Sequence, residues 1–264
     1  MATLVTFHAH PDDESIATGG VMAKAADEGH RVVLVVATRG EHGEVEEGFL
    51  APGETLGERR VKETQACADI LGAARLEFLG YVDSGMIGTP ENDAPESFWQ
   101  ADVEEAASRL AAILTDEGAD VLTVYDENGG YGDPDHIQVH RVGLRAAELA
   151  GTPRVYMNTI NRDRLQRSMQ AAVDRGAEMP ADLNPDDLKN LGVSEDRITT
   201  TVDIRPWLVR KRAAMAAHAS QISETSFFLA MAPELFEGGF GQEWFIRCAA
   251  PPGTAETDLL ADLG

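Results

Sequence analysis

Hydrophobic and polar positions alternate along the chain in blocks that are typical of successive strands and helices. Short apolar, β-branched runs predict strands, and the longer amphipathic segments between them predict helices. The expected strands cover residues 3–7, 31–37, 75–79, 120–125, 154–160, 200–204 and 243–248. The expected helices cover residues 15–29, 58–72, 98–117, 136–150, 206–219 and 226–236. This order predicts an α/β fold with a Rossmann-like, mostly parallel sheet and helices on both faces.

Two long irregular segments, residues 39–57 and 82–97, interrupt the alternation. Each follows an expected strand, so we expect both to lie over the carboxyl end of the sheet, where open α/β folds bind ligands. Residues 161–199 are polar and helical at first and then loop-like, which predicts a lobe over the sheet. We expect residues 1–264 to form a single domain that includes this lobe.

The composition is that of an ordinary globular protein. Of 264 residues, 43% are hydrophobic, which is enough for a full core. The sequence has no apolar run of the roughly 18 residues that a membrane helix needs. It also lacks the charged start of a signal peptide, so we expect a cytoplasmic protein. The two cysteines, Cys67 and Cys248, have apolar neighbours and are expected to be buried free thiols.

The charge balance restricts the partners. Asp and Glu number 45 against 22 Lys and Arg, which gives a formal net charge of -23. Such a surface repels nucleic acid phosphates and anionic membranes, so we expect neither as a partner. A small molecule is the expected partner, and the oligomeric state, homo-oligomers included, is left open.

Two clusters of histidines and carboxylates follow two of the expected strands. Residues 8–14 read HAHPDDE, and residues 125–140 read YDENGGYGDPDHIQVH. Burying such charges is costly unless they are paired or bind a metal, although acidic residues also favour a helix N-terminus. Since parallel strands end at one edge of a sheet, a His and an Asp from the first cluster and a His from the second can meet. Three protein ligands leave a zinc ion one open position for water.

These motifs resemble the LmbE-like, or PIG-L-like, family of zinc-dependent N-acetyl deacetylases. The similarity extends, in the family's order, to DEGHRV, GYVDSGM (80–86), TVYDENGGYG (123–132) and AHASQI (217–222). It is closest to the branch of the mycothiol-pathway deacetylase and the mycothiol S-conjugate amidase. The resemblance implies a hydrolase that removes an N-acetyl group from an amino sugar, with N-acetylglucosaminyl-inositol of mycothiol biosynthesis as the first candidate. It leaves open amide cleavage of a thiol conjugate of mycothiol and deacetylation of a natural product.

By position, the family's metal ligands fall on His10, Asp13 and His136, and its general base falls on Asp12. The resemblance implies Zn2+, while Fe2+ is left open because His and carboxylate ligands suit several divalent metals. Zinc makes water a nucleophile at neutral pH, and a carboxylate such as Asp12 can take its proton and pass it to the departing amine.

Further residues of the sequence are candidates for contact with the substrate. Arg60 and Asp83 fall where the family holds substrate hydroxyls, although an ordinary helix-surface Arg and a loop-capping Asp are equally good interpretations. Glu14 is expected to bond either a ligand or a backbone turn. Ala17 falls where relatives carry a polar residue tied to substrate choice, which weakens the transfer of any one substrate.

The second cluster departs from the family pattern. Relatives usually carry His-Pro-Asp-His, where this chain reads Asp133-Pro134-Asp135-His136. In relatives the first His is thought to stabilise the oxyanion and protonate the leaving group. Asp133 is therefore a catalytic candidate by its position in the family motif. A carboxylate repels a forming oxyanion, however, and Asp before Pro is a good helix N-cap, so Asp133 is also expected to cap the helix.

This departure leaves several interpretations open. Our hypothesis is that Asp12 serves as both base and acid, with Tyr131 polarising the carbonyl; entry of another His, such as His42 or His140, is an alternative. A catalytically impaired metal-binding protein is the rival from another class. A nucleotide-binding module is disfavoured, because no G-x-G-x-x-G turn follows the first strand. Among the other histidines we expect His8 to support the site, and His30 and His218 to be structural.

Overall fold

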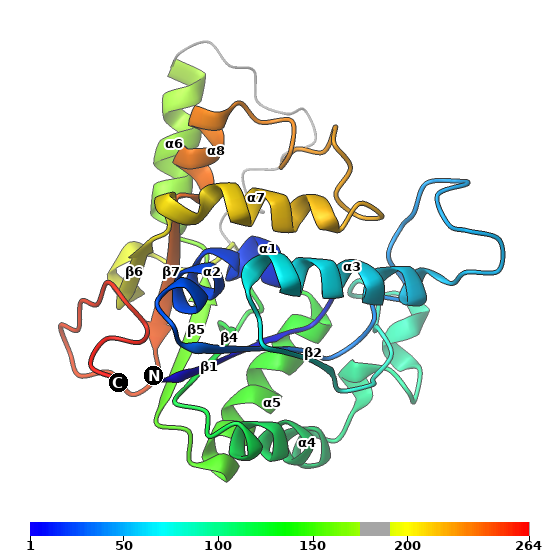
Figure 1. Cartoon of the computed structure of the whole chain (residues 1–264), viewed down its shortest axis with the longest axis horizontal. Coiled ribbons are helices and arrows are strands. Elements are labelled where there is room, and N and C mark those ends of the chain that lie inside the picture. The colour runs from blue at the N-terminus through cyan, green and yellow to red at the C-terminus, as the bar shows by residue number, and fades with distance from the viewer. Residues whose placement is uncertain (175–190, 264) are drawn as a thin grey trace.

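A computed structural model describes residues 1–174 and 191–263 and places seven strands in one sheet (Figure 1). The strands are β1 (Thr3–His8), β2 (Arg31–Val36), β3 (Arg75–Phe78), β4 (Val121–Tyr125), β5 (Arg154–Thr159), β6 (Thr200–Asp203) and β7 (Gln242–Arg247). Their order in the sheet is β3-β2-β1-β4-β5-β7-β6. The first five strands are parallel, whereas β7 runs antiparallel to both β5 and β6.

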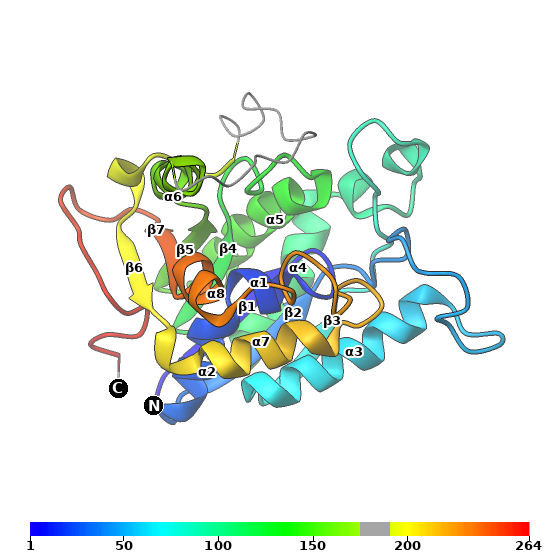
Figure 2. The ribbon, with the colours of Figure 1, turned by 90° about the horizontal axis from the view of Figure 1, so that it is seen from above.

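Helices cover both faces of this sheet. They are α1 (Asp13–Ala17), α2 (Gly19–Asp27), α3 (Leu56–Leu71), α4 (Val103–Asp116), α5 (Pro134–Ala150), α6 (Arg162–Asp174), α7 (Leu208–Ala217) and α8 (Pro233–Phe240). Helices α2, α3 and α7 lie on one face, and α4 and α5 lie on the other (Figure 1). Seen from above, α3 and α7 lie side by side (Figure 2). The predicted α/β class, with a mostly parallel sheet between two helical layers, is therefore confirmed.

The central strands contribute alternate residues to two apolar layers of the core, one on each face of the sheet. On β2, Val33 and Val35 pack toward α4 and α5, whereas Val32 and Leu34 pack toward α2 and α3. Side chains alternate between the faces of a strand, so a strand covered on both sides needs apolar residues at every position. Each fully buried aliphatic side chain contributes about 1.5–3 kcal/mol.

Most helix boundaries lie within about two residues of the predictions, and the larger differences are at three places. The helix expected over 15–29 is two helices, because the Thr18 hydroxyl bonds the Glu14 carbonyl (3.3 Å) and the His8 ring (2.8 Å) where the chain turns. Residues 98–100 form a 3-10 turn, and α4 begins after its N-cap, Asp102. The helix expected over 226–236 begins only at Pro233, which suits a first helical position.

Part of the predicted lobe at 161–199 can be placed. Residues Arg162–Asp174 form α6, which contacts α8 where Arg164 Nη2 donates to the Gly238 carbonyl (3.3 Å). Residues 175–190 lie outside the described part of the chain. A single domain for the whole chain, lobe included, stays a prediction.

The sheet order reverses direction at β1. From β1 the chain builds β2 and β3 on one side, then returns to place β4 and β5 on the other. Open α/β sheets bind ligands at such a switch point, beyond the carboxyl ends of the strands. Both clusters of histidines and carboxylates start there, after β1 and after β4. None of the helices in the described ranges is long and apolar enough to span a membrane.

Candidate active site

The first cluster lies on a tight turn between β1 and α1. Asp12 has a φ of 102°, a value that side-chain-bearing residues rarely adopt. Its N–H donates to Glu14 Oε2 (3.0 Å), and its carbonyl accepts from Ser15 Oγ (2.7 Å). Local hydrogen bonds therefore hold Asp12 in a strained conformation, a feature that often marks functional sites.

The second cluster lies on a glycine-rich turn between β4 and α5. Gly129 has a φ of 61°, and a Cβ there would lie 2.6 Å from the Cβ of His136, so only glycine fits. The Gly129 carbonyl lies 3.1 Å from His136 Nδ1, which fixes the ring. This leaves His136 Nε2 facing the first cluster.

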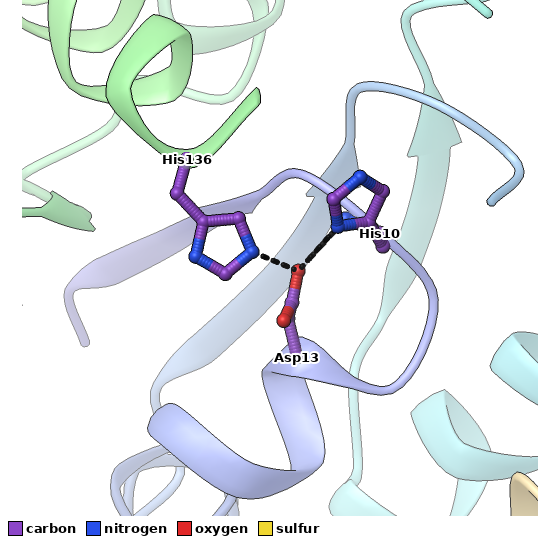
Figure 3. Close-up of side chains that lie close together, drawn as sticks. All are labelled: His10, Asp13 and His136. Atoms are coloured by element: carbon purple, nitrogen blue, oxygen red, sulfur yellow. Dashed lines mark hydrogen bonds and ion pairs between the residues drawn. The ribbon is translucent and has the colours of Figure 1, made fainter. Parts of the chain in front are cut away.

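His10, Asp13 and His136 converge at this switch point (Figure 3). Asp13 Oδ2 lies 3.3 Å from His136 Nε2 and 3.5 Å from His10 Nδ1. One ligand atom from each residue lies within 4.8 Å of the others. The three predicted ligands lie up to 126 positions apart in the sequence. They meet here because both clusters follow parallel strands that end at the same edge of the sheet, as predicted.

The environment of this cluster fits a cation. His136 Nε2 is buried, and its polar neighbour in the described part is Asp13 Oδ2 at 3.3 Å, which does not form a hydrogen bond with it. Tyr125 stacks on the His136 ring at 4.2 Å between centroids. Burial acts to raise the pKa of Asp13, but His136 and His10 outweigh it and hold that pKa well below its usual range. Two imidazoles and an ionised carboxylate form a donor set typical of catalytic zinc.

An outer carboxylate that the sequence did not reveal supports His10. Asp135 Oδ2 lies 3.2 Å from His10 Nε2 and accepts from the Ser84 N–H (2.9 Å). Carboxylates that bond the second nitrogen of a ligating His orient its ring. The only local signal for this role is the position of Asp135 directly before His136.

The carboxyl group of Asp12 lies beside the cluster and has a raised pKa. Burial raises the pKa of its carboxyl to about 6, against the opposing charge of Arg60, whose Nη2 lies 3.5 Å from Asp12 Oδ2. Arg60 is itself buried and donates to the carbonyls of Pro11 and Gly40. Arg60 therefore braces the turn that carries Asp12, and its predicted contact with substrate stays a prediction.

The other predicted substrate residues are Glu14 and Asp83. Glu14 is fully buried and accepts the Asp12 N–H, so it bonds the backbone turn, the second of its two expected roles. Asp83 accepts from the N–H groups of His42 (3.1 Å) and Gly85 (2.8 Å), and its Oδ1 lies 3.6 Å from His10 Nε2. Tyr131 is 48% exposed, and its ring meets the His136 ring edge-on at 4.9 Å. Asp83 and Tyr131 therefore both border the cluster.

Asp133 acts as the N-cap of α5. Its Oδ1 accepts from the N–H groups of Asp135 (2.8 Å) and His136 (3.2 Å). Burial raises the pKa of this carboxyl above its ordinary value. The capping role considered from the sequence is confirmed, and a further role in catalysis stays a prediction.

The remaining histidines near the site lie outside the cluster. His8 is buried against the Tyr125 hydroxyl (3.0 Å), and burial lowers its pKa to about 4. His140 Nδ1 lies 3.0 Å from the Tyr125 carbonyl, while the His42 side chain is exposed. His8 therefore supports Tyr125, which stacks on His136, as expected of a residue behind the site.

Comparisons with known proteins agree with this geometry. Residues 5–147 match the PIG-L family, described as GlcNAc-PI de-N-acetylase. A 1D-myo-inositol 2-acetamido-2-deoxy-alpha-D-glucopyranoside deacetylase of Geodermatophilus obscurus is 40% identical, covering 98% of this chain and 97% of its own. The protein of that name from Thermomonospora curvata is 42% identical, covering 95% and 92%. The N,N'-diacetylchitobiose deacetylase of Pyrococcus horikoshii shares the fold, with a TM-score of 0.58, 23% identity and coverage of 95% and 84%.

Proposed function

The chain belongs to the PIG-L family of GlcNAc-PI de-N-acetylases, and from this premise we propose that it deacetylates an N-acetylglucosaminyl-inositol. The observation that carries the proposal is the cluster of His10, Asp13 and His136, with the strained Asp12 beside it. Relatives that align with almost the whole chain carry this substrate in their names.

We propose that His10, Asp13 and His136 hold one Zn2+ ion; Fe2+ has similar ligand preferences and is the alternative. The buried Nε2 of His136, which faces the ionised Asp13 at 3.3 Å without a hydrogen bond, supports this assignment. When bound there, the ion would supply Lewis acidity, which polarises an amide carbonyl and makes water more acidic.

Asp12 is the proposed general base and acid. Its carboxylate accepts a proton from the attacking water and returns it to the nitrogen as the amide C–N bond breaks, so acetate and a free amine leave. A carboxyl with a pKa of about 6 is suited to both transfers near neutral pH. The bonds from Arg60 to the Pro11 and Gly40 carbonyls keep the turn in place during both steps.

Tyr131 is the proposed donor to the developing oxyanion. It borders His136 and is partly exposed, so its hydroxyl has room to turn toward a bound substrate. Asp133 is occupied as a helix cap and carries the wrong charge for this task. Asp83, which borders His10, is proposed to accept a hydrogen bond from a sugar hydroxyl.

Two other functions are distinguishable by experiment. An amidase for thiol conjugates of mycothiol would use the same chemistry on a longer substrate. A metal-binding protein with impaired catalysis is favoured by one observation, the capping carboxylate of Asp133 at the position of the family's His. A cytoplasmic location and a homo-oligomeric state stay predictions, because the contacts among the described residues test neither.

The decisive experiment measures acetate release from N-acetylglucosaminyl-inositol by protein of known metal content. We expect turnover that requires one metal per chain, disappears with a chelator and returns with zinc. Asp12→Asn keeps the shape of the side chain and should bind metal normally while losing about 10²–10⁴-fold in kcat.

The outcomes separate the candidates. Hydrolysis of a mycothiol conjugate without acetate release from the inositol sugar would favour the amidase. One bound metal per chain without turnover of either substrate would favour the impaired metal-binding protein. Turnover that survives Asp12→Asn would remove Asp12 from the mechanism.

A further inference from the structure

A fully buried group of side chains lies directly behind the turn that carries Asp12. It consists of Glu14, Cys67 and His218, which lie within 4.8 Å of one another and are shielded from solvent. Glu14 Oε1 lies 2.7 Å from His218 Nε2, and Glu14 Oε2 accepts the Asp12 N–H at 3.0 Å. One carboxylate thus joins His218 to the backbone of Asp12.

We infer that His218 is a positioning residue, which fixes the Glu14 carboxylate and through it the strained conformation that aims Asp12. This inference rests on the proposed function, since it concerns the aim of the proposed base. By this inference His218 affects the rate of the reaction, whereas the sequence predicted only a structural role for it.

The backbone of Asp12 needs such support. A φ of 102° is unfavourable for a residue with a side chain, so the turn relaxes unless its surroundings hold it. The Asp12 N–H has Glu14 Oε2 as its acceptor, and loss of that acceptor would free the peptide plane to rotate. Rotation there moves the Asp12 carboxylate relative to Asp13, its neighbour in the chain.

Glu14 holds the turn only if its own carboxylate is fixed. With no solvent exposure, it depends on protein donors to stay in place and charged. The His218 ring is equally buried, and its Nε2–Glu14 contact is the one hydrogen bond that the described residues offer it; Nδ1 has none. The ring is therefore dedicated to Glu14.

The element that supplies His218 is rigidly attached to the same region. His218 is the C-cap of α7. On this helix Lys211 donates to the Ile16 carbonyl of α1 (2.7 Å) and to the buried Glu243 (2.5 Å). Beyond it, Ser220 donates through N–H (3.0 Å) and Oγ (2.6 Å) to Glu63 of α3. His218 thus approaches Glu14 from a segment anchored on both sides.

The test compares three variants of His218 with a matched control on α7. His218→Phe keeps the ring volume without a donor, and His218→Asn keeps an amide too short to reach Glu14. His218→Gln extends its amide about as far as Nε2 and keeps the donor. Met215→Ala, on the same helix, removes apolar atoms from a fully buried side chain that packs among apolar residues and forms no hydrogen bond with the described residues.

We expect His218→Phe and His218→Asn to lower kcat about 100-fold, as misplaced catalytic groups do, with KM and bound metal nearly unchanged. His218→Gln should restore most of the rate. Met215→Ala should lower Tm while its kcat stays at the wild-type value below its unfolding temperature. Wild-type kcat in His218→Phe or His218→Asn would overturn the inference. So would a loss of kcat in His218→Gln or Met215→Ala as large as that in His218→Phe.

A second readout needs neither turnover nor metal. Amide hydrogen exchange of the metal-free protein should be faster at Asp12 in the Phe and Asn variants and unchanged in Met215→Ala. If the wild type releases no acetate, the proposed function has failed while this exchange still tests the link from His218 to Asp12. Equal protection of the Asp12 amide in all variants would show that no such link exists.

Discussion

Asp133 shows how one substitution can leave a fold intact and change the groups available for chemistry. Its carboxylate caps α5 through two backbone N–H groups. Asp133→Asn should keep the cap and stay within about threefold of the wild-type kcat, whereas Asp133→Ala should lose about 1 kcal/mol of unfolding free energy. Urea unfolding together with acetate release checks both values. An inactive Asn variant with full metal content would place the carboxylate in the reaction.

Tyr131 is the residue we expect to compensate for the missing His. Tyr131→Phe should lower kcat at least about tenfold, because one hydrogen-bond donor to an oxyanion commonly contributes that much or more. KM should change little, since the donor acts mainly on the transition state. Tyr81→Phe is the control, because the Tyr81 hydroxyl is buried without a partner among the described residues. An unchanged rate for Tyr131→Phe would refute its share in catalysis.

The meeting of the three proposed metal ligands could be predicted at this scale, whereas most of the contacts that support them could not. His10, Asp13 and His136 stand in motifs that directly follow strands, so their meeting point follows from parallel topology. The pair of Glu14 and His218 joins residues 204 positions apart. No local pattern marks such a contact, because it depends on how α7 packs against α1 and α3.

At the scale of elements, Glu117 ties the end of α4 to the sheet. Glu117 accepts hydrogen bonds from Arg31 of β2 and Arg75 of β3. These two partners, Arg31 more strongly than Arg75, lower the pKa of Glu117 to about 2 from an ordinary 4.5. A depressed carboxyl stabilises the fold above its unfolded pKa and loses that contribution as pH falls. The pairs should therefore stabilise the metal-free protein fully above pH 4.5 and progressively less toward pH 2.

Glu117→Gln tests this pH dependence. The variant should be less stable than the wild type by about 1 kcal/mol at pH 6, a value limited by solvent screening of the exposed guanidinium groups. The difference should shrink as the pH approaches 2, the folded pKa. Urea unfolding of both metal-free proteins over this range measures it. A constant difference across the range would mean that the charge of Glu117 is not the source.

Elements with strong apolar patterns were predictable, and their ends were less so. All seven strands were expected close to their observed positions, because apolar, β-branched runs leave few alternatives. The break at Thr18 was missed, since it depends on a bond from His8 across the layer. Pro233 marks the start of α8, but the apolar residues before it also favour a helix and led to the earlier predicted start.

For the whole molecule, the net charge of -23 predicts a response to salt. Like charges on a compact surface repel one another, and salt shortens the range of that repulsion from about 10 Å at 0.1 M to about 3 Å at 1 M. We expect Tm to rise by several degrees between about 0.1 and 1 M sodium chloride. Calorimetry of the metal-loaded protein measures it, and a flat or falling Tm would mean that repulsion is unimportant here.

The antiparallel strand β7 has a consequence for synthesis of the chain. Among the strands of the described residues, β6 pairs only with β7, and β7 is also the neighbour of β5 on the side away from β4. On the ribosome, the edge of β5 therefore stays open until residue 247 has emerged, although the strands before it can already pair. An open edge invites pairing with other chains, so translational pauses or truncations before this point should favour aggregation. We therefore expect chains that end before β7 to aggregate more than the complete chain, even though β7 contributes no residue to the candidate active site.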